Sequence, residues 1–569
     1  MNVFPSVFRP YVGAVAVAVL AAGCTGLGSM EKEIEALGLK ASPEPLILRG
    51  GQVELNITGK FQEKYFSKKV SLQATPVLSW NGRSADFTTA RYQGESVAGN
   101  DPVVPFETGK AIEYTASIPF DPAMEDVAEL AVRVSGSKGS KSENFAPIAI
   151  GTGVITTPLL LQDDDRFIPS TDAYVRTTTA TIEAVINFEV SKSVVRPAEL
   201  KDADWVALQN FALLAARVDS LEIKSVTIEA FASPEGEITI NENLAQERAA
   251  AANAVYAAIF TKAKVAAPAG TPSLQPKGED WEGFKQKMQA SSIADKNLIL
   301  RVLEMYSDKN KREEEIRNMA KTYKEIAETI LPELRRARLI VTYEIIGYSD
   351  EQLKSMAMTT PARLTVEELL YAAKITEDMN SKLSIYQAVA RQFPTDFRGF
   401  NNAGWALMQL GRPVQAKELF NQALAVKRDK AVLNNVAAMK RMDGDIDGAM
   451  KLLNEAAGAG PEVNYNKGLI LIEKGEYASA ISNMGNANTV NLALAKMLNG
   501  DLAGATTVLG NAKTSTAIDS YIKAIAAARA NDVEGTKRNL ADAIAKDAKL
   551  RDKAKRDLEF RNVRAQLAL

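Results

Sequence analysis

The C-terminal part of the chain repeats one spacing of small and large residues. A Gly is followed after five residues by Ala, after four more by a large side chain and after three more by a second Ala. The Gly recurs after 33, 31 and 25 residues. Pairs of helices explain this spacing, because Gly ends one helix and Ala lets the next approach it closely. The units are Gly411, Ala416, Phe420, Ala423; Gly444, Ala449, Leu453, Ala456; Gly475, Ala480, Met484, Ala487; and Gly500, Ala505, Leu509, Ala512.

One such helix pair cannot bury its apolar face alone, so several must stack into a solenoid. The pattern resembles that of the tetratricopeptide repeat family, whose period is about 34 residues. The resemblance predicts an all-α solenoid over residues 360–569, whose concave face binds protein partners. A generic helical bundle is the alternative. Residues that precede the first unit fit the same family pattern: Phe400, Ala403, Gly404 and Leu407.

The composition excludes several classes of function. A chain of 569 residues is too long for one hydrophobic core and predicts several domains. It contains no His and one Cys, which removes the commonest general base, the commonest metal ligand and any intramolecular disulfide. A net charge of -2 disfavours a nucleic-acid partner. We therefore expect no catalytic residues, no metal and no cofactor; paired carboxylates acting on the cell wall remain the enzymatic alternative.

The N-terminal 24 residues have the features of an export signal. The uncharged apolar run of residues 12–22 is too short to span a bilayer. It leads into Leu20-Ala21-Ala22-Gly23-Cys24, which resembles the lipobox of bacterial lipoproteins, although that family places Leu three residues before Cys and here Leu20 is four before. The resemblance implies that the single Cys, Cys24, carries a lipid anchor. A plain signal peptide with a chance Cys is the alternative.

The residue after the lipobox Cys bears on the membrane to which a lipoprotein is sorted. In the lipoprotein family an Asp at that position favours the inner membrane, and here the position is Thr25. The resemblance therefore predicts an outer-membrane lipoprotein that faces the periplasm. Residues 25–40 are predicted to form a flexible linker, because they begin with small residues.

Residues 41–170 show short alternating runs separated by Gly, Pro and Asn. Runs such as 53–57, 70–74 and 111–118 alternate apolar and polar side chains, which is typical of antiparallel strands with one buried face. Several such strands predict an N-terminal β-sandwich. The three consecutive carboxylates at 163–165 lack the regular spacing of a calcium loop, so we expect a solvated acidic linker there.

The central part, residues 180–347, alternates predicted strands and helices and therefore predicts an α/β domain. An insertion is expected at about 264–334, and its later part is largely charged and predicted to be helical. Apolar periodicity predicts strands at 182–190, 226–231 and 338–345, and helices at 205–218 and 241–260.

The turn at 232–236 and the helix after it carry a recognisable motif. Gly236, Asn241, Leu244 and the pair Arg248-Ala249 resemble, at the same spacing, the OmpA C-terminal family of peptidoglycan-associated domains. That family binds the free carboxylate of diaminopimelate with an Asp, the Arg and backbone N–H groups at a helix start.

The resemblance makes Arg248, Asn241, Ser233 and Glu235 the candidate peptidoglycan-binding residues. Arg248 retains the guanidinium that pairs with a carboxylate. Ser233 replaces the Asp and carries no charge, although Glu235 is near enough in sequence to substitute for it. The other interpretation is that Arg248 and Asn241 only hold the turn onto the helix.

The domain order resembles that of OmpA-family lipoproteins of Bacteroidetes-type bacteria, in which the Ala-Ser-Pro-Glu-Gly variant of residues 232–236 occurs. The sequence thus predicts a multidomain, non-enzymatic lipoprotein of the cell envelope. Its repeats would scaffold protein partners at the outer membrane, with weak peptidoglycan contact through the central domain. The alternative is a dedicated peptidoglycan-binding tether.

Overall fold

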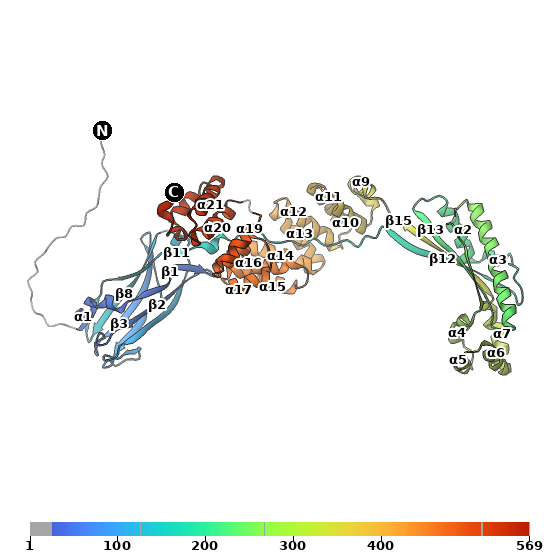
Figure 1. The fold of residues 1–569 in the computed structure, drawn as a ribbon, viewed down its shortest axis with the longest axis horizontal. Helices are drawn as coiled ribbons and strands as arrows, with labels where there is room; N and C mark the ends of the chain where they lie inside the picture. Colours follow the sequence, from blue (N-terminus) through green and yellow to red (C-terminus); the bar gives the residue numbers. More distant parts are fainter. Residues whose placement is uncertain (1–25, 126, 267, 514–515, 568–569) are drawn as a thin grey trace, which may run out of the picture. The chain divides into compact units, whose positions relative to one another are not determined.

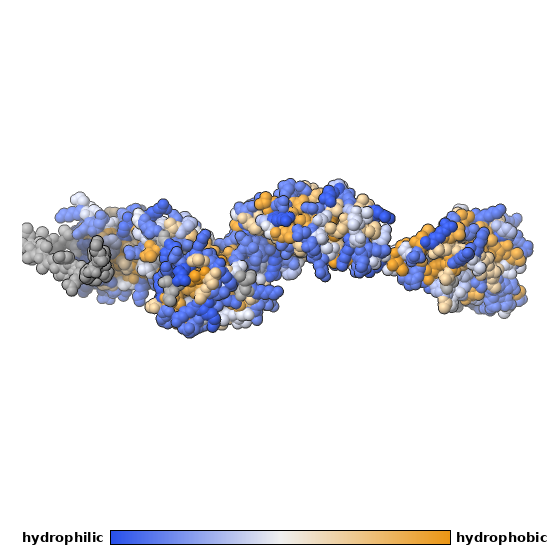
Figure 2. Space-filling model, turned by 90° about the horizontal axis from the view of Figure 1, so that it is seen from above, coloured by the Kyte–Doolittle hydropathy of each residue, from blue (hydrophilic) through white to orange (hydrophobic). Residues whose placement is uncertain are grey.

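The computed structural model describes residues 26–125, 127–266, 268–513 and 516–567. Cys24 and the export signal lie outside these residues. The chain divides into two compact units, Met1–Ser170 with Val389–Leu569, and Thr171–Ala388 (Figure 1). Among the described residues, none of the helices is long and apolar enough to cross a membrane. Hydrophilic residues predominate on the face shown in Figure 2, with smaller hydrophobic patches between them.

The first unit begins with two β-sheets, each hydrogen-bonded in an order that differs from the sequence order. One sheet runs β11 (Val154–Ile155), β1 (Lys40–Arg49), β2 (Gln52–Phe61) and β7 (Lys110–Pro119). The other runs β10 (Ile148–Thr152), β8 (Ala128–Lys138), β3 (Ser71–Trp80), β5 (Ala90–Gly94) and β6 (Val103–Val104), with β4 (Arg83–Asp86) beside β3 and β9 (Lys141–Asn144) beside β8.

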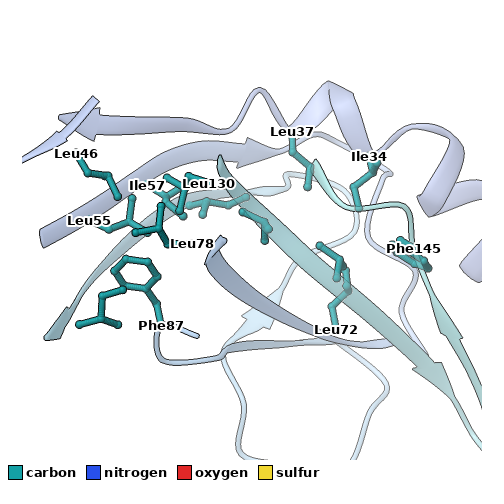
Figure 3. Packing of buried hydrophobic residues seen from close by; sticks show 14 of the residues in the cluster. Ile34, Leu37, Leu46, Leu55, Ile57, Leu72, Leu78, Phe87, Leu130 and Phe145 are labelled. Atoms are coloured by element: carbon teal, nitrogen blue, oxygen red, sulfur yellow. The ribbon is translucent and has the colours of Figure 1, made fainter. Parts of the chain in front are cut away.

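Period-two alternation builds the core between these sheets. On β2 the side chains of Val53, Leu55 and Ile57 are buried while the residues between them are exposed. Apolar side chains from both sheets meet in one cluster, part of which is drawn in Figure 3, where Leu55, Ile57, Leu78 and Leu130 lie close together.

The segment before the sandwich is more ordered than the linker expected at 25–40. It forms helix α1 (Gly26–Lys32) and a short 3-10 turn η1 (Ile34–Leu37). Leu27, Met30 and Leu37 are buried in the sandwich core, and burial of these apolar side chains explains why the segment does not stay a free tether.

The sandwich also ends earlier than the expected boundary at 170. Its last strand ends at Ile155, and a 3-10 turn η3 (Thr157–Leu160) follows. Residues 161–170, which we call the strap, belong to no helix or strand and run along the helical repeats of the same unit.

The rest of the first unit consists of paired helices, and the predicted repeats are confirmed. The turn glycines Gly411, Gly444, Gly475 and Gly500 have φ between 68° and 86°, where only Gly is unstrained. The Ala five residues after each is fully buried between the two helices. The helices are α12 (Phe397–Gln409), α13 (Pro413–Val426), α14 (Lys430–Met442), α15 (Ile446–Glu455), α16 (Pro461–Glu473), α17 (Tyr477–Met484), α18 (Val490–Leu498), α19 (Leu502–Asn511), α20 (Ala517–Arg529), α21 (Val533–Lys546) and α22 (Leu550–Arg556).

Within this unit the sandwich contacts the repeats at the turn between β1 and β2. Arg49 Nε donates to the Gly475 carbonyl at 2.9 Å, and its guanidinium lies 5.6 Å from the centre of the Tyr477 ring. Gly50 lies against the repeats so closely that a Cβ there would be 2.7 Å from the Lys474 carbonyl oxygen.

The second unit contains a mixed four-stranded sheet in the order β12 (Thr177–Asn187), β15 (Arg336–Ile346), β13 (Leu221–Ala232) and β14 (Ser273–Glu279). β14 pairs parallel to β13, so residues expected in the helical insertion instead complete the sheet. Helices α2 (Ala203–Ala215) and α3 (Ile238–Ala263) contribute to the core of this sheet.

The helical insertion is therefore shorter than 264–334 and has a core of its own. Three more helices, expected among the repeats, are assigned wholly or largely to this second unit. The insertion comprises α4 (Trp281–Ala290), α5 (Lys296–Met305), α6 (Lys309–Asn318), α7 (Ala320–Thr329) and α8 (Leu331–Leu334), and the three further helices are α9 (Asp350–Thr359), α10 (Val366–Ile375) and α11 (Met379–Gln392).

Candidate peptide-binding face

Four repeats carry an asparagine nine residues before the turn glycine. Because of this common register, each lies on the first helix of its pair, on α12, α14, α16 and α18. All four side chains are at most 1% exposed, and a buried amide is costly unless its donor and acceptor are both paired. These residues, Asn402, Asn435, Asn466 and Asn491, define what we call the asparagine face.

Each of these amides pairs with the backbone of one strap residue through both of its polar atoms. Asn402 accepts the Ser170 N–H at 2.7 Å and donates to the Ser170 carbonyl at 2.9 Å. Asn435 binds Ile168 at 2.7 and 2.9 Å, and Asn466 binds Arg166 at 2.8 and 2.8 Å. Asn491 binds Gln162 at 3.0 and 2.8 Å. The strap is thus held as an extended chain whose direction opposes the order of the repeats (Figure 1).

A second pair of asparagines ties neighbouring repeats together beneath the strap. Asn401 and Asn434 donate to the carbonyls of Ile168 and Arg166, at 3.0 and 2.8 Å. The amide oxygen of Asn401 accepts from Asn435 at 2.9 Å, and that of Asn434 accepts from Asn466 at 3.1 Å. The amides therefore form a connected network in which donors and acceptors are shared between consecutive repeats.

The acidic part of the strap is bound by one buried arginine, Arg441 of α14. Its side chain is 3% exposed and pairs with Asp165, with Asp163 at 2.6 Å and with Glu473 at 2.5 Å. Burial by itself would lower the pKa of Arg441, but its bonds and charge interactions with these carboxylates raise it, so the guanidinium stays charged. The expectation of a solvated acidic linker at 163–165 is therefore wrong for Asp165, whose carboxylate is buried against this guanidinium.

Other strap side chains make contacts that depend on their identity. The ring of Phe167 stacks on that of Phe420, with centroids 5.7 Å apart and an interplanar angle of 4°. The Arg166 guanidinium lies 3.7 Å from the centre of the Tyr465 ring, and the Tyr465 hydroxyl donates to Asp164 at 2.5 Å. The asparagine face thus binds the backbone of the strap, while Arg441 and the rings of Phe420 and Tyr465 contact its side chains.

The predicted peptidoglycan site lies in the second unit, and the Arg248 guanidinium, expected to pair with a carboxylate, is buried there. Its side chain is 1% exposed and donates to three backbone carbonyls, those of Lys192 at 3.1 Å, Phe231 at 2.8 Å and Glu189 at 3.3 Å. Burial, with a contribution from the charge of Arg335, lowers the pKa of Arg248 to about 10. Strand and loop carbonyls therefore enclose the guanidinium that the prediction assigned to a ligand carboxylate.

The other three predicted residues do come together at the turn before α3. Ser233 donates to the Glu235 carboxylate at 2.6 Å, and Asn241 donates to the Glu235 carbonyl at 3.1 Å. The Glu235 carboxylate also accepts from Arg335 at 2.7 and 3.0 Å. Glu235 is therefore already paired with a cation of its own domain.

Glu313 of α6, which no sequence pattern indicated, also binds this turn. Its carboxylate accepts the Gly236 N–H at 2.6 Å and pairs with Arg317 at 2.5 Å. Burial raises the pKa of Glu313, while the Gly236 N–H and Arg317 oppose the rise. No spacing in the sequence connects the insertion to this turn. A carboxylate of the chain itself thus occupies the backbone position at which the family resemblance expected a ligand carboxylate.

The comparisons with known proteins concern the helical repeats. The sequence profile of the tetratricopeptide repeat family matches residues 397–430, which hold α12 and α13. No curated protein matches the chain significantly.

Similar solved structures include a tetratricopeptide repeat protein from Parabacteroides merdae, 14% identical, with a TM-score of 0.28 over 37% of this chain and 91% of that chain. PilF from Pseudomonas aeruginosa is 16% identical, with a TM-score of 0.26 over 38% of this chain and 97% of that one. The match covers one repeat, and the neighbouring helix pairs share its spacing of Gly and Ala, so the C-terminal part of this chain is an array of helix pairs that includes a tetratricopeptide repeat.

Proposed function

We propose that this chain is a non-enzymatic scaffold of the cell envelope that holds protein partners through its tetratricopeptide repeats. In this proposal a lipid on Cys24 anchors it to the outer membrane, facing the periplasm. The observation that carries the proposal is the asparagine face, which holds an extended polypeptide by its backbone. Backbone pairing of this kind supplies affinity for any extended segment, while neighbouring side chains supply selectivity.

The experiment is covalent capture of partners in living cells. Photo-crosslinking should recover proteins with the wild-type chain, and the triple variant Asn402→Ala, Asn435→Ala, Asn466→Ala should lose them. A matched control is Asn421→Ala, Asn454→Ala, Asn511→Ala, which removes exposed asparagines from three second helices of the array, α13, α15 and α19. Equal recovery with both triple variants would contradict a role for the asparagine face.

Contact with peptidoglycan is the second candidate function, and one observation favours it. The turn before α3 already binds a carboxylate, since the Gly236 N–H donates to Glu313. A carboxylate of the wall peptide would have to displace Glu313 from this position.

Sedimentation of the protein with purified sacculi tests this candidate. Glu313→Ala should increase the fraction that sediments, because it frees the Gly236 N–H, and Glu314→Ala on the exposed side of the same helix should not. If neither the wild type nor Glu313→Ala sediments, the central domain has no wall-binding role.

A further inference from the structure

The strap occupies the surface that the proposed function assigns to partners. We propose that the asparagine face binds a partner segment of the same chemistry as the strap, an extended peptide with two acidic residues two positions apart and an aromatic residue two positions further on, and that the strap competes with it. This inference rests on the proposed function and adds to it the partner's chemistry and an internal competitor.

The backbone contacts place few demands on the sequence of the occupant. Asn402, Asn435 and Asn466 bind strap residues two apart, which is the side-chain period of an extended chain. Pro169, which has no N–H, falls between two bound residues, where none is needed. An extended segment of another protein could satisfy the same amides.

Arg441 sets the chemistry of that segment. If the strap left, Glu473 would still pair with Nη1, but Nε and Nη2 would lose Asp163 and Asp165. A buried guanidinium without its partners is costly, so a replacement segment must bring carboxylates to the same place. The Phe420 ring, on which Phe167 stacks, selects an aromatic residue two positions further on.

In this proposal the strap leaves the asparagine face while the repeats stay folded. It belongs to no helix or strand, and Asp163, Asp164 and Pro169 are exposed. It is nevertheless tethered by the turn η3, whose Leu160 is buried in the core of the last repeats. A short tether gives the strap an effective concentration of about 1 mM at the asparagine face. A free peptide with an intrinsic Kd of about 10 μM would therefore bind the intact chain about 100-fold more weakly.

The test titrates a fluorescent peptide with the sequence of residues 160–171 into the full chain and follows its anisotropy. The opened variant Asp163→Asn, Asp165→Asn, Phe167→Ala keeps the size of the acidic side chains but removes their charge and the stacked ring. We expect this variant to bind the peptide at least 10-fold more tightly than the wild type. Adding Arg441→Met should abolish the gain, and a peptide of scrambled order should bind the opened variant more weakly, because it keeps the backbone contacts but loses those of Arg441 and Phe420.

A second opened variant, in which residues 163–168 are all Gly or Ser, guards against a folding defect peculiar to the first, and circular dichroism checks both. Equal binding by wild-type and opened chains, or binding that survives Arg441→Met, would overturn the proposal. So would a wild-type dimer that the peptide converts to monomers, because the occupant would then be the strap of a second copy. If the peptide does not bind but partners are still captured in cells, this inference is refuted and the scaffold proposal stands. If the peptide binds but no partners are captured in cells, the scaffold proposal is refuted and the competition for the asparagine face stands.

Discussion

At the scale of single residues, an asparagine side chain can reproduce the hydrogen bonding of a neighbouring β-strand. Its amide offers one acceptor and a donor group, the same pair that a backbone peptide presents. Asn435 accepts from the Ile168 N–H and donates to the Ile168 carbonyl, and its second amide hydrogen bonds to Asn401. Its amide is therefore fully paired although it is buried. Removing Asn435 leaves the Ile168 N–H without a partner, and the Ile168 carbonyl keeps only the bond from Asn401.

Asn435→Ala should therefore lower the free energy of unfolding by about 2–3 kcal/mol, since it removes four hydrogen bonds at a buried site. Urea denaturation measures this change. Asn421→Ala, an exposed asparagine on α13, should alter stability by less than about 0.5 kcal/mol. Similar losses in the two variants would argue against the hydrogen bonds as the cause.

Arg441→Met should be more damaging, because it leaves the buried carboxylate of Asp165 without its partner. Breaking a buried ion pair from one side costs about 3–5 kcal/mol. The exposed ion pair of Lys474 with Asp447 serves as the control. The Asp447 side chain is 93% exposed, so Asp447→Ala should lower the free energy of unfolding by at most about 1 kcal/mol. Thermal unfolding of the two variants side by side decides between a buried and a solvated role for Arg441.

Cys24, the predicted site of lipid attachment, lies outside the described residues, and its role stays a prediction. Cells fed an alkyne fatty acid should label the wild-type chain, and Cys24→Ser should carry no label, because no other Cys is present. Fractionation should then move the variant out of the membrane, since stable anchoring requires acyl chains. Labelling of both forms would exclude Cys24 as the acylated residue.

At the scale of elements, the sequence predicted those parts whose pattern is periodic. The Gly and Ala register located the repeats, and the alternation of 53–57 located a strand of the sandwich. The asparagines share the same register as the turn glycines and could have been found by it. The binding of the strap could not be predicted, because three consecutive Asp form no periodic pattern. Arg441, which buries Asp165, is also 276 positions away. Glu313 reaches Gly236 across 77 positions for the same reason.

The strap should be protected from proteolysis as long as the asparagine face holds it. Trypsin cleaves after Arg166, whose N–H and carbonyl are both bound to Asn466. Cleavage there requires local opening, so the triple variant Asn402→Ala, Asn435→Ala, Asn466→Ala should be cut at least about 10-fold faster. Mass spectrometry of the fragments identifies the site, and Asn421→Ala, Asn454→Ala, Asn511→Ala should be cut at the wild-type rate.

At the scale of the whole molecule, the first unit joins the sandwich to repeats that follow more than two hundred residues later in the sequence. The turn at Gly50 and Gly51 tests this junction, since both have positive φ, 57° and 77°. Only Gly50 has a neighbour, the Lys474 carbonyl, whereas nothing lies within 4 Å of a Cβ at Gly51.

Gly51→Ala should cost about 1–2 kcal/mol, the strain of a left-handed Ala. Gly50→Ala should cost about 1–3 kcal/mol more, because its Cβ collides with the repeats as well. Because both variants add the same backbone strain, the difference between their midpoints of thermal unfolding measures the contact between the sandwich and the repeats. Equal midpoints would mean that the sandwich and the repeats separate freely.

The register between strap and repeats has an evolutionary consequence. Arrays of this kind ordinarily gain or lose units by duplication and deletion within a gene, because each unit contacts only its neighbours. Here Asn402, Asn435 and Asn466 advance two strap residues per unit, so an added unit would need two more strap residues, encoded far upstream. A single duplication or deletion changes the number of units but not the length of the strap. The number of units between Asn402 and Asn491 should therefore be the same in every descendant that keeps the strap.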